Sequence, residues 1–376
     1  MNILFIGPYR QFDSWGYKSR ATLKALQNTS HTIISRPIFL SNNIQFNQYI
    51  EPSEQASINE YDIIIQYVLP PYTTYIGGAK NIGIFNYETI TNGVSKDFLI
   101  SETLMDELWT DNSLIQNGLE KSLQRYGINT KVTNVPTVID LQLLPENPSQ
   151  SFVRDNGSED RFMFYCLLNP FDIKDGFKEI CTAYLNSFTT NDKVALTIFT
   201  DQQVDPKKVT DLLDECKKSL GNRISPYDQP VIHVKMPEKN LWTMEDKVKM
   251  HIYGDSYISM SRSFCTDITT IESAIYQKNP IVMNDNAALE ILTTDNLWVV
   301  DSFHDSCLYN TNPLPFRYTS KELWNRPNIS KLSQTMKECF VNKRKRDKQA
   351  SNNKKLRSKL SNISYEKYLK EKDDRC

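Results

Sequence analysis

Three stretches of the sequence carry residues whose types and spacing could bind or turn over a ligand. The first runs from Gly7 to Gly16, contains Trp15 and follows a short apolar run. A glycine loop ahead of a helix presents backbone N–H groups and the positive end of the helix dipole to an anion. The loop has neither GxGxxG nor P-loop spacing, which excludes the NAD and ATP fingerprints. An anion-binding loop and an ordinary βα turn both fit it.

The second stretch ends at Glu88, directly after an apolar run at residues 81–87. The carboxyl ends of the strands in a doubly wound sheet face the ligand cleft. A carboxylate in this place could position an acceptor hydroxyl or act as an acid or base. A helix-capping or solvated glutamate is the alternative interpretation.

The third stretch predicts a strand that ends at Ser261, then a polar turn, then a helix that begins near Asp267. Thr266 or Asp267 can cap this helix, which leaves the backbone N–H groups as far as Thr269 for a diphosphate. Glu272 follows in the first turns, where a buried carboxylate can accept both hydroxyls of a ribose. This stretch therefore predicts a nucleotide site.

Composition limits the classes of protein to which the chain can belong. Its 376 residues exceed the ~100–200 of one typical domain, so we expect two domains, and 39% hydrophobic residues suffice for packed cores. The net charge is −1, no apolar run reaches the ~18 residues of a membrane span, and residues 3–6 are too short for a signal-peptide core. Seven scattered cysteines without CxxC spacing favour free thiols over a disulfide framework or zinc site. We therefore expect a cytoplasmic protein, in the host-cell cytoplasm if the chain is viral.

Apolar runs alternate with helical stretches in both halves of the chain, on either side of a segment rich in Pro, Ser and Asn at residues 143–160. Runs this apolar are typical of parallel strands buried on both faces. We expect strands at residues 2–6, 31–38, 61–68, 81–87, 107–110, 131–135, 161–168, 194–200, 231–236, 256–261 and 280–283. We expect helices at residues 17–26, 113–126, 176–185, 206–220, 244–251 and 269–276.

This alternation predicts an α/β protein with two Rossmann-like doubly wound domains that face a cleft. The predicted parts are an N-terminal domain at residues 1–145, a linker at 146–160, a second domain at 161–335 and a basic helical segment at 336–376.

The motifs of the second half resemble those of the group 1 glycosyltransferases of the GT-B fold, which use nucleotide-sugar donors. Residues 261–274 read SRSFCTDITTIESA and are followed by PIV at 280–282, in the spacing of the family's SRxEGFGLPxLEAxxxxxPVI. Earlier, MDELWT at 105–110 is similar to the family's MDEVWVPS, and VPTVID at 135–140 is similar to IPxGVD. Tyr87-Glu88-Thr89 resembles an ET element of some members.

The chain also departs from the family pattern. Phe264 stands at the first of the family's paired glutamates, and Glu272 matches the second. The arginine and lysine that hold the donor phosphates fall on Asn169 and Asp175, with Lys174 one place early.

The resemblance implies a retaining transferase without an obligatory metal, although Mg²⁺ is compatible with it. It implies a nucleotide-diphosphate sugar as donor, UDP- or GDP-linked, and a hydroxyl of a glycan, a lipid or another molecule as acceptor. It also implies that a terminal helix at residues 365–372 packs back toward the N-terminal domain. The residues assigned on this basis are Glu88 for catalysis, Trp15 and Tyr87 for the acceptor, and Gly16, Lys174, Arg262, Asp267, Ile268, Thr269 and Glu272 for the donor.

The C-terminal segment leaves further interpretations open. Residues 343–359 hold nine Lys or Arg against one acidic residue. Such a run fits a solvated helix face, a contact with an anionic membrane surface, or a contact with a nucleic-acid backbone. One alternative function is therefore a DNA-modifying glycosyltransferase that acts on a hydroxymethylated base. Another is a non-catalytic module that binds nucleotides or glycans.

Overall fold

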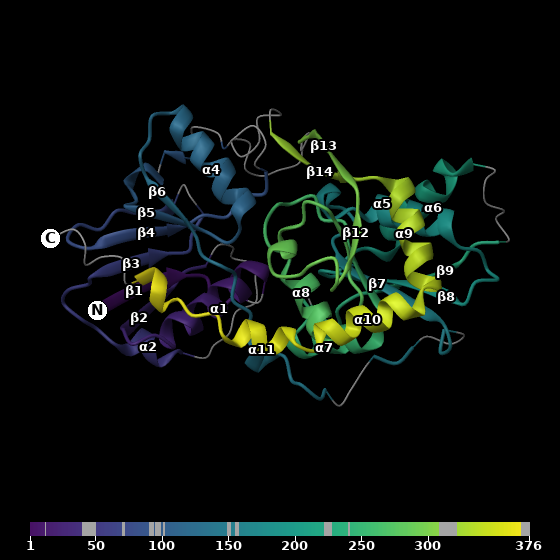
Figure 1. Cartoon of the computed structure of the whole chain (residues 1–376), viewed down its shortest axis with the longest axis horizontal. Helices are drawn as coiled ribbons and strands as arrows, with labels where there is room; N and C mark the ends of the chain where they lie inside the picture. Colours follow the sequence, from purple (N-terminus) through teal and green to yellow (C-terminus); the bar gives the residue numbers. More distant parts are fainter. Residues whose placement is uncertain are drawn as a thin grey trace.

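The computed structural model describes residues 1–11, 13–39, 50–69, 72–89, 94, 99–100, 102–148, 152–154, 158–221, 228–239, 241–307 and 322–369. Two six-stranded sheets lie side by side, one from each half of the chain (Figure 1). The strand pairs within both sheets are parallel. The predicted pair of doubly wound sheets is confirmed.

The first sheet has the strand order β2-β1-β3-β4-β5-β6. Its strands are β1 Asn2–Gly7, β2 Thr32–Pro37, β3 Ile63–Gln66, β4 Lys80–Ile84, β5 Glu107–Thr110 and β6 Lys131–Asn134. Its helices are α1 Ser14–Gln27, α2 Pro52–Gln55 and α4 Ser113–Arg125.

The second sheet has the strand order β12-β11-β10-β7-β8-β9. Its strands are β7 Phe162–Leu168, β8 Val194–Thr200, β9 Val231–Lys235, β10 Ser256–Ser259, β11 Ile281–Met283 and β12 Trp298–Val300. Its helices are α5 Phe177–Ser187, α6 Pro206–Ser219, α7 Met244–Tyr253 and α8 Ile268–Ile275.

Burial explains why apolar runs were sufficient to find most strands. All seven residues of β8 and all four of β3 are buried, because helices or neighbouring elements cover both faces of the parallel sheets. Polar side chains at the helix starts set the helix boundaries. Asp13 accepts a hydrogen bond from the backbone N–H of Gly16, and Asn112 accepts one from Ile115.

Three strands were not predicted. β12 is a run of three residues, too short for periodicity to show. β13 Ser302–Ser306 and β14 Leu323–Pro327 form an antiparallel pair of partly polar strands that lie 16 residues apart in the sequence, so no hairpin signal marks them. In addition, β4 ends at Ile84 rather than at residue 87.

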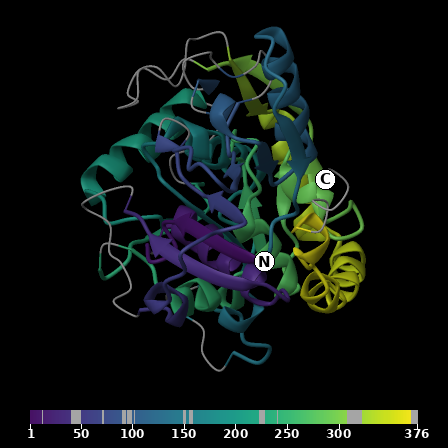
Figure 2. The same cartoon turned by 90° about the vertical axis from the view of Figure 1, so that its left-hand side faces the viewer.

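The C-terminal helices lie along the second domain and reach the first (Figures 1 and 2). They are α9 Ile329–Val341, α10 Lys343–Asn353, α11 Leu356–Ser361 and α12 Glu366–Leu369. Tyr365 and Leu369 pack in the core of the first sheet, and the Tyr365 hydroxyl donates to the Pro136 carbonyl at 3.3 Å. The segment therefore contacts both domains. Residues 370–372 of the expected terminal helix lie outside the described residues.

Several bases of the basic segment bind the protein itself. The Lys345 ammonium lies 3.6 Å from the centre of the Trp298 ring, and Lys348 pairs with Asp295. The Arg346 guanidinium donates to the Cys339 and Phe340 carbonyls, and that of Arg357 donates to the Leu141 and Leu144 carbonyls. Part of this charge therefore holds the C-terminal helices onto the two domains.

The six described cysteines are free thiols, and Cys376 lies outside the described residues. None of the described helices combines the length and the apolar character needed to cross a membrane.

One buried acid leads to a prediction about pH. Glu102 is 2% exposed, and burial raises the pKa of its carboxyl to about 8, with a smaller lowering by a hydrogen bond from Thr73. Since the folded-state pKa lies above the ordinary glutamate value of 4.5, the contribution of Glu102 to stability is complete below about pH 4.5 and is lost as the pH rises through about 8. We expect Glu102→Gln to stabilise the protein relative to wild type at pH 9, at ~1.4 kcal/mol per unit of pKa shift removed.

Urea unfolding at pH 5 and pH 9 measures this effect, with the exposed Glu60→Gln as the matched control. If the free energies of unfolding of Glu102→Gln and wild type differed by the same amount at both pH values, the prediction would be wrong.

Candidate active site

A cavity of about 420 Å³ lies between the two domains, where the carboxyl ends of strands from both sheets meet. Asn86 and Glu88, which follow β4, line it from the first domain. Asp175, after β7, and Asp201, after β8, line it from the second. Its volume lies in the range of roughly 300–1,000 Å³ that is typical of small-molecule sites. The cleft is therefore the candidate site.

The N-terminus of α8 opens into this cavity. Asp267, Ile268 and Thr269 all line it. Asp267 is the N-cap, because its carboxylate accepts from the backbone N–H of Thr270 at 3.2 Å and from the Thr270 hydroxyl at 2.8 Å. The first N–H groups of the helix and its positive dipole end thus face the cavity, an arrangement that suits a phosphate.

Glu272 lies one turn further along α8, lines the same cavity and is 1% exposed. One carboxylate oxygen lies 3.7 Å from Nε2 of His251, whose Nδ1 is 2.9 Å from the Tyr165 hydroxyl. Burial lowers the pKa of His251, while Glu272 opposes the change, so the imidazole is neutral at pH 7. Tyr17 of α1 approaches from the first domain: burial, followed by the charge of Glu272, raises the pKa of its hydroxyl.

Glu88 and Lys174 form an ion pair that crosses between the domains. The Lys174 ammonium lies 2.9 Å from a carboxylate oxygen of Glu88 and 3.5 Å from one of Asp172. Glu88 lines the cavity, whereas Lys174 is not among its lining residues. The structure thus holds the Lys174 ammonium against two carboxylates.

The structure also places Arg262 away from the cavity lining. Its side chain is buried, its guanidinium pairs with Glu179 of α5, and it lies 5.1 Å from the centre of the Trp324 ring. This position differs from the phosphate contact expected from the sequence. The physical reason is that a buried guanidinium requires an anionic partner, which Glu179 provides inside the domain.

Of the three other residues assigned from the sequence, Trp15 lies at the cavity, whereas Gly16 and Tyr87 lie in the protein interior. Trp15 lines the cavity, with its ring 5.5 Å from that of Tyr67. Gly16 does not line it: its N–H donates to Asp13, and a Cβ there would lie 2.0 Å from the Gln11 carbonyl oxygen, so the close approach requires glycine. Tyr87 has a fully buried ring that packs against Phe85 in a hydrophobic core.

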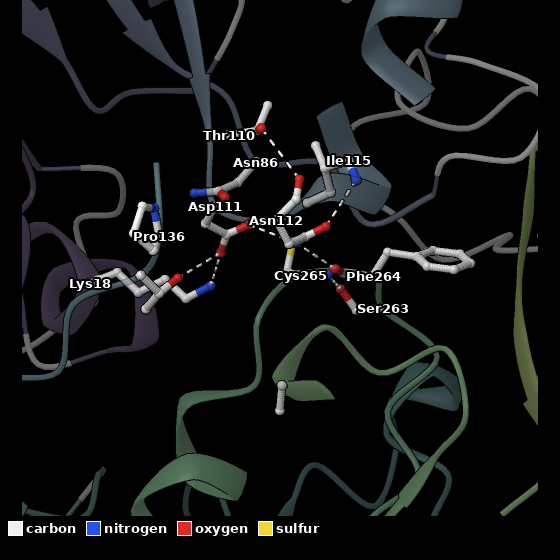
Figure 3. Close-up of polar contacts among 12 residues, drawn as sticks. Lys18, Asn86, Thr110, Asp111, Asn112, Ile115, Pro136, Ser263, Phe264 and Cys265 are labelled. Atoms are coloured by element: carbon white, nitrogen blue, oxygen red, sulfur yellow. Dashed lines mark hydrogen bonds and ion pairs between the residues drawn. The ribbon is translucent and has the colours of Figure 1, made fainter. Parts of the chain in front are cut away.

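Phe264 joins the two domains near the cleft (Figure 3). Its chain position is in the second domain, but its ring is buried in the core cluster of the first. Its backbone N–H donates to the Glu88 carbonyl at 3.2 Å, and the Asn112 side chain donates to the Phe264 carbonyl at 3.0 Å. The residue that replaces the family's first glutamate therefore serves as a contact between domains.

Polar residues that line the cavity but were not assigned to the site from the sequence include Lys18, Asn86, Asp175, Asp201 and Lys247. Burial raises the pKa of Asp175 to about 7 and that of Asp201 to about 6. The position of Asn86 and Asp201 just after strands was the available signal, since those ends face the cleft. Within the described residues, no group of three or more His, Cys, Asp or Glu side chains has the arrangement of a metal site.

Comparisons with known proteins agree with this architecture. No protein-family model and no curated protein matches the sequence. Among solved structures, apo OtsA is 9% identical with a TM-score of 0.64, over 98% of this chain and 97% of that one. The E. coli trehalose-6-phosphate structure bound with UDP-2-fluoro glucose is 10% identical with a TM-score of 0.63. The match covers 98% of this chain and 97% of that one. Anabaena HepE in complex with UDP and glucose is 12% identical with a TM-score of 0.61, over 98% of both chains. The chain therefore has the GT-B fold, as its motifs predicted.

Proposed function

We propose that this protein is a glycosyltransferase that takes a sugar from a nucleotide-diphosphate sugar and transfers it to an acceptor hydroxyl. The observation that carries the proposal is the presence of the α8 N-terminus and Glu272 side by side in one interdomain cavity. Two proteins of the same fold are described with UDP-2-fluoro glucose and with UDP and glucose.

The proposed donor site uses both features of α8. The N–H groups of Ile268 and Thr269 and the helix dipole bind the diphosphate. Glu272 accepts hydrogen bonds from the hydroxyls of the ribose, because an ionised carboxylate only accepts hydrogen bonds. The neutral His251 beside Glu272 leaves the carboxylate charge available to the ligand.

The proposed acceptor side is formed by Trp15 and Glu88, which line the cavity from the first domain. Catalysis then depends mainly on holding the acceptor hydroxyl near the anomeric carbon and on stabilising the charge of the departing diphosphate. The ion pair with Lys174 fixes the orientation of the Glu88 carboxylate. Retention of configuration, a UDP or GDP donor and independence from metal are part of the proposal, as the family resemblance implies.

A non-catalytic binding module is the second candidate. It is favoured by Phe264, which occupies the place of a family glutamate and is buried in the first domain. The DNA-modifying alternative gains no support from residues 343–359, since several of their bases bind the protein's own carbonyls, carboxylates and aromatic rings.

The test is a thermal-shift panel of UDP-, GDP-, ADP- and CMP-sugars on wild type and on Glu272→Gln. A ligand at 100 times its dissociation constant that binds only the native state adds ~2.7 kcal/mol of stability. We expect one nucleotide-sugar to stabilise wild type and to lose this effect in Glu272→Gln, while the exposed Glu238→Gln responds like wild type. No stabilisation by any member of the panel would contradict the proposal. Binding without release of the nucleoside diphosphate in the presence of mixed sugar acceptors would favour the binding module.

A further inference from the structure

Neither of the two cations expected to hold the donor phosphates lines the cavity. Lys174 pairs with Glu88 and Asp172, and Arg262 pairs with Glu179. Asp175, at one family cation position, lines the cavity as an acid. The donor site proposed above therefore needs positive charge from another part of the chain, and the inference below rests on that proposed function.

Two lysines, Lys18 and Lys247, line the cavity among the described residues. Lys18 belongs to α1 in the first domain, and its ammonium lies 3.1 Å from a carboxylate oxygen of Asp111 (Figure 3). Burial alone would lower the pKa of Lys18, but Asp111 and, more weakly, Asp267 raise it, and the resulting pKa is above its usual value. Lys18 is therefore a cation at neutral pH although only 15% of its side chain is exposed.

Lys18 lines the same cavity as the turn that leads into α8, since Cys265, Thr266 and Asp267 of that turn are also lining residues. The same turn holds Thr266, which lines the cavity, is 4% exposed and has a hydroxyl oxygen with no hydrogen-bond partner among the described residues. A buried hydroxyl without a partner points to a ligand, since such groups are otherwise hydrogen-bonded in native proteins.

We propose that Lys18 supplies, from the first domain, the cation that binds the diphosphate of the donor against the N-terminus of α8 and the Thr266 hydroxyl. The anion then contacts both domains, because Lys18 is on α1 and α8 belongs to the second sheet's domain. Its charge is shared between an ammonium and a helix dipole rather than held by a pair of cations after β7.

Calorimetric titration with inorganic pyrophosphate and with UDP tests this assignment. A hydrogen bond between charged groups is worth a factor of about 10 to 100 in affinity, so we expect Lys18→Met to weaken binding of both probes by that factor. We expect Lys18→Arg, which keeps the positive charge, to lose less affinity for both probes than Lys18→Met. Lys247, whose ammonium lies 5.9 Å from the centre of the Tyr17 ring, provides the matched control, and Lys247→Met should lose less than Lys18→Met.

Lys18→Met leaves Asp111 buried without its cation, which can impair folding. The double variant Lys18→Met/Asp111→Asn removes both charges, and we expect it to fold and to show the same loss of pyrophosphate binding. Wild-type affinity in this double variant, or a larger loss in Lys247→Met, would overturn the assignment of Lys18 while the proposed function stands. Lys18-dependent binding of pyrophosphate without binding of any nucleotide-sugar would support the anion site and contradict the glycosyltransferase. No binding of pyrophosphate or UDP to wild type would overturn the assignment.

Discussion

Replacing Phe264 with alanine is expected to destabilise the protein by about 3–5 kcal/mol, the cost typical of removing a buried phenylalanine ring. The ring is 1% exposed and packs with Phe85, Leu99, Leu108 and other core residues of the first domain. Its removal leaves a cavity in that core and also loosens the contact between the two domains, because Phe264 belongs to the chain of the second.

Equilibrium unfolding in urea measures this loss, with Phe303→Ala as the control, since Phe303 is 48% exposed. The control should cost far less. If Phe264→Ala were as stable as Phe303→Ala, the ring would not be packed in the first domain, and its role as an interdomain contact would be wrong. Domain separation can be followed in parallel by small-angle scattering, where we expect a larger radius of gyration for Phe264→Ala.

Arg262→Met is expected to cost about 3–5 kcal/mol of stability, because it leaves Glu179 as a buried charge without a partner. Both side chains are at least nine-tenths buried. We expect the double variant Arg262→Met/Glu179→Met to recover much of the loss, since it removes both charges at once. Nucleotide binding by the folded fraction should change little, because the Arg262 side chain does not line the cavity.

Urea unfolding and titration with UDP on the same samples separate the two roles of Arg262. The exposed pair of Lys178 and Glu215 serves as the matched control, and Lys178→Met should leave stability almost unchanged. The opposite result, full stability with loss of UDP binding, would restore the phosphate role that the sequence resemblance assigned to Arg262.

Phe264 and Arg262 show which structural features the family motif predicts and which it does not. The sequence around residues 256–274 correctly predicted the order of a strand, a turn and a helix, although β10 ends at Ser259 rather than at Ser261. Of the two candidate cap residues, Asp267 is the N-cap. The spacing of the motif could not predict that Arg262 turns into the domain toward Glu179, which lies 83 positions earlier in the sequence. A motif specifies the local backbone, whereas the direction of a long side chain depends on its partners in the fold.

The cleft, too, has features that the sequence predicts and features that only the tertiary structure reveals. That it lies at the carboxyl ends of the strands could be predicted from the alternation of apolar runs and helices. Glu88, Trp15 and, on α8, Ile268, Thr269 and Glu272 were assigned from the sequence and line the cavity. Gly16 and Tyr87 were also assigned and do not line it. The place of Lys18 at the cavity could not be predicted from the sequence. Its counter-ion Asp111 is 93 positions away, and only the folded domain brings the two side chains together.

The sequence by itself determined the two doubly wound sheets, most of their strands and the helix that begins after Asp267. These features depend on neighbours within a few residues: apolar runs that must be buried and side chains that bond the next turn. The tertiary structure alone decided which cations reach the cavity, where Phe264 is buried and how the C-terminal helices join the domains. Charged and aromatic side chains require partners that exclude water, and those partners come from segments that are distant in the sequence.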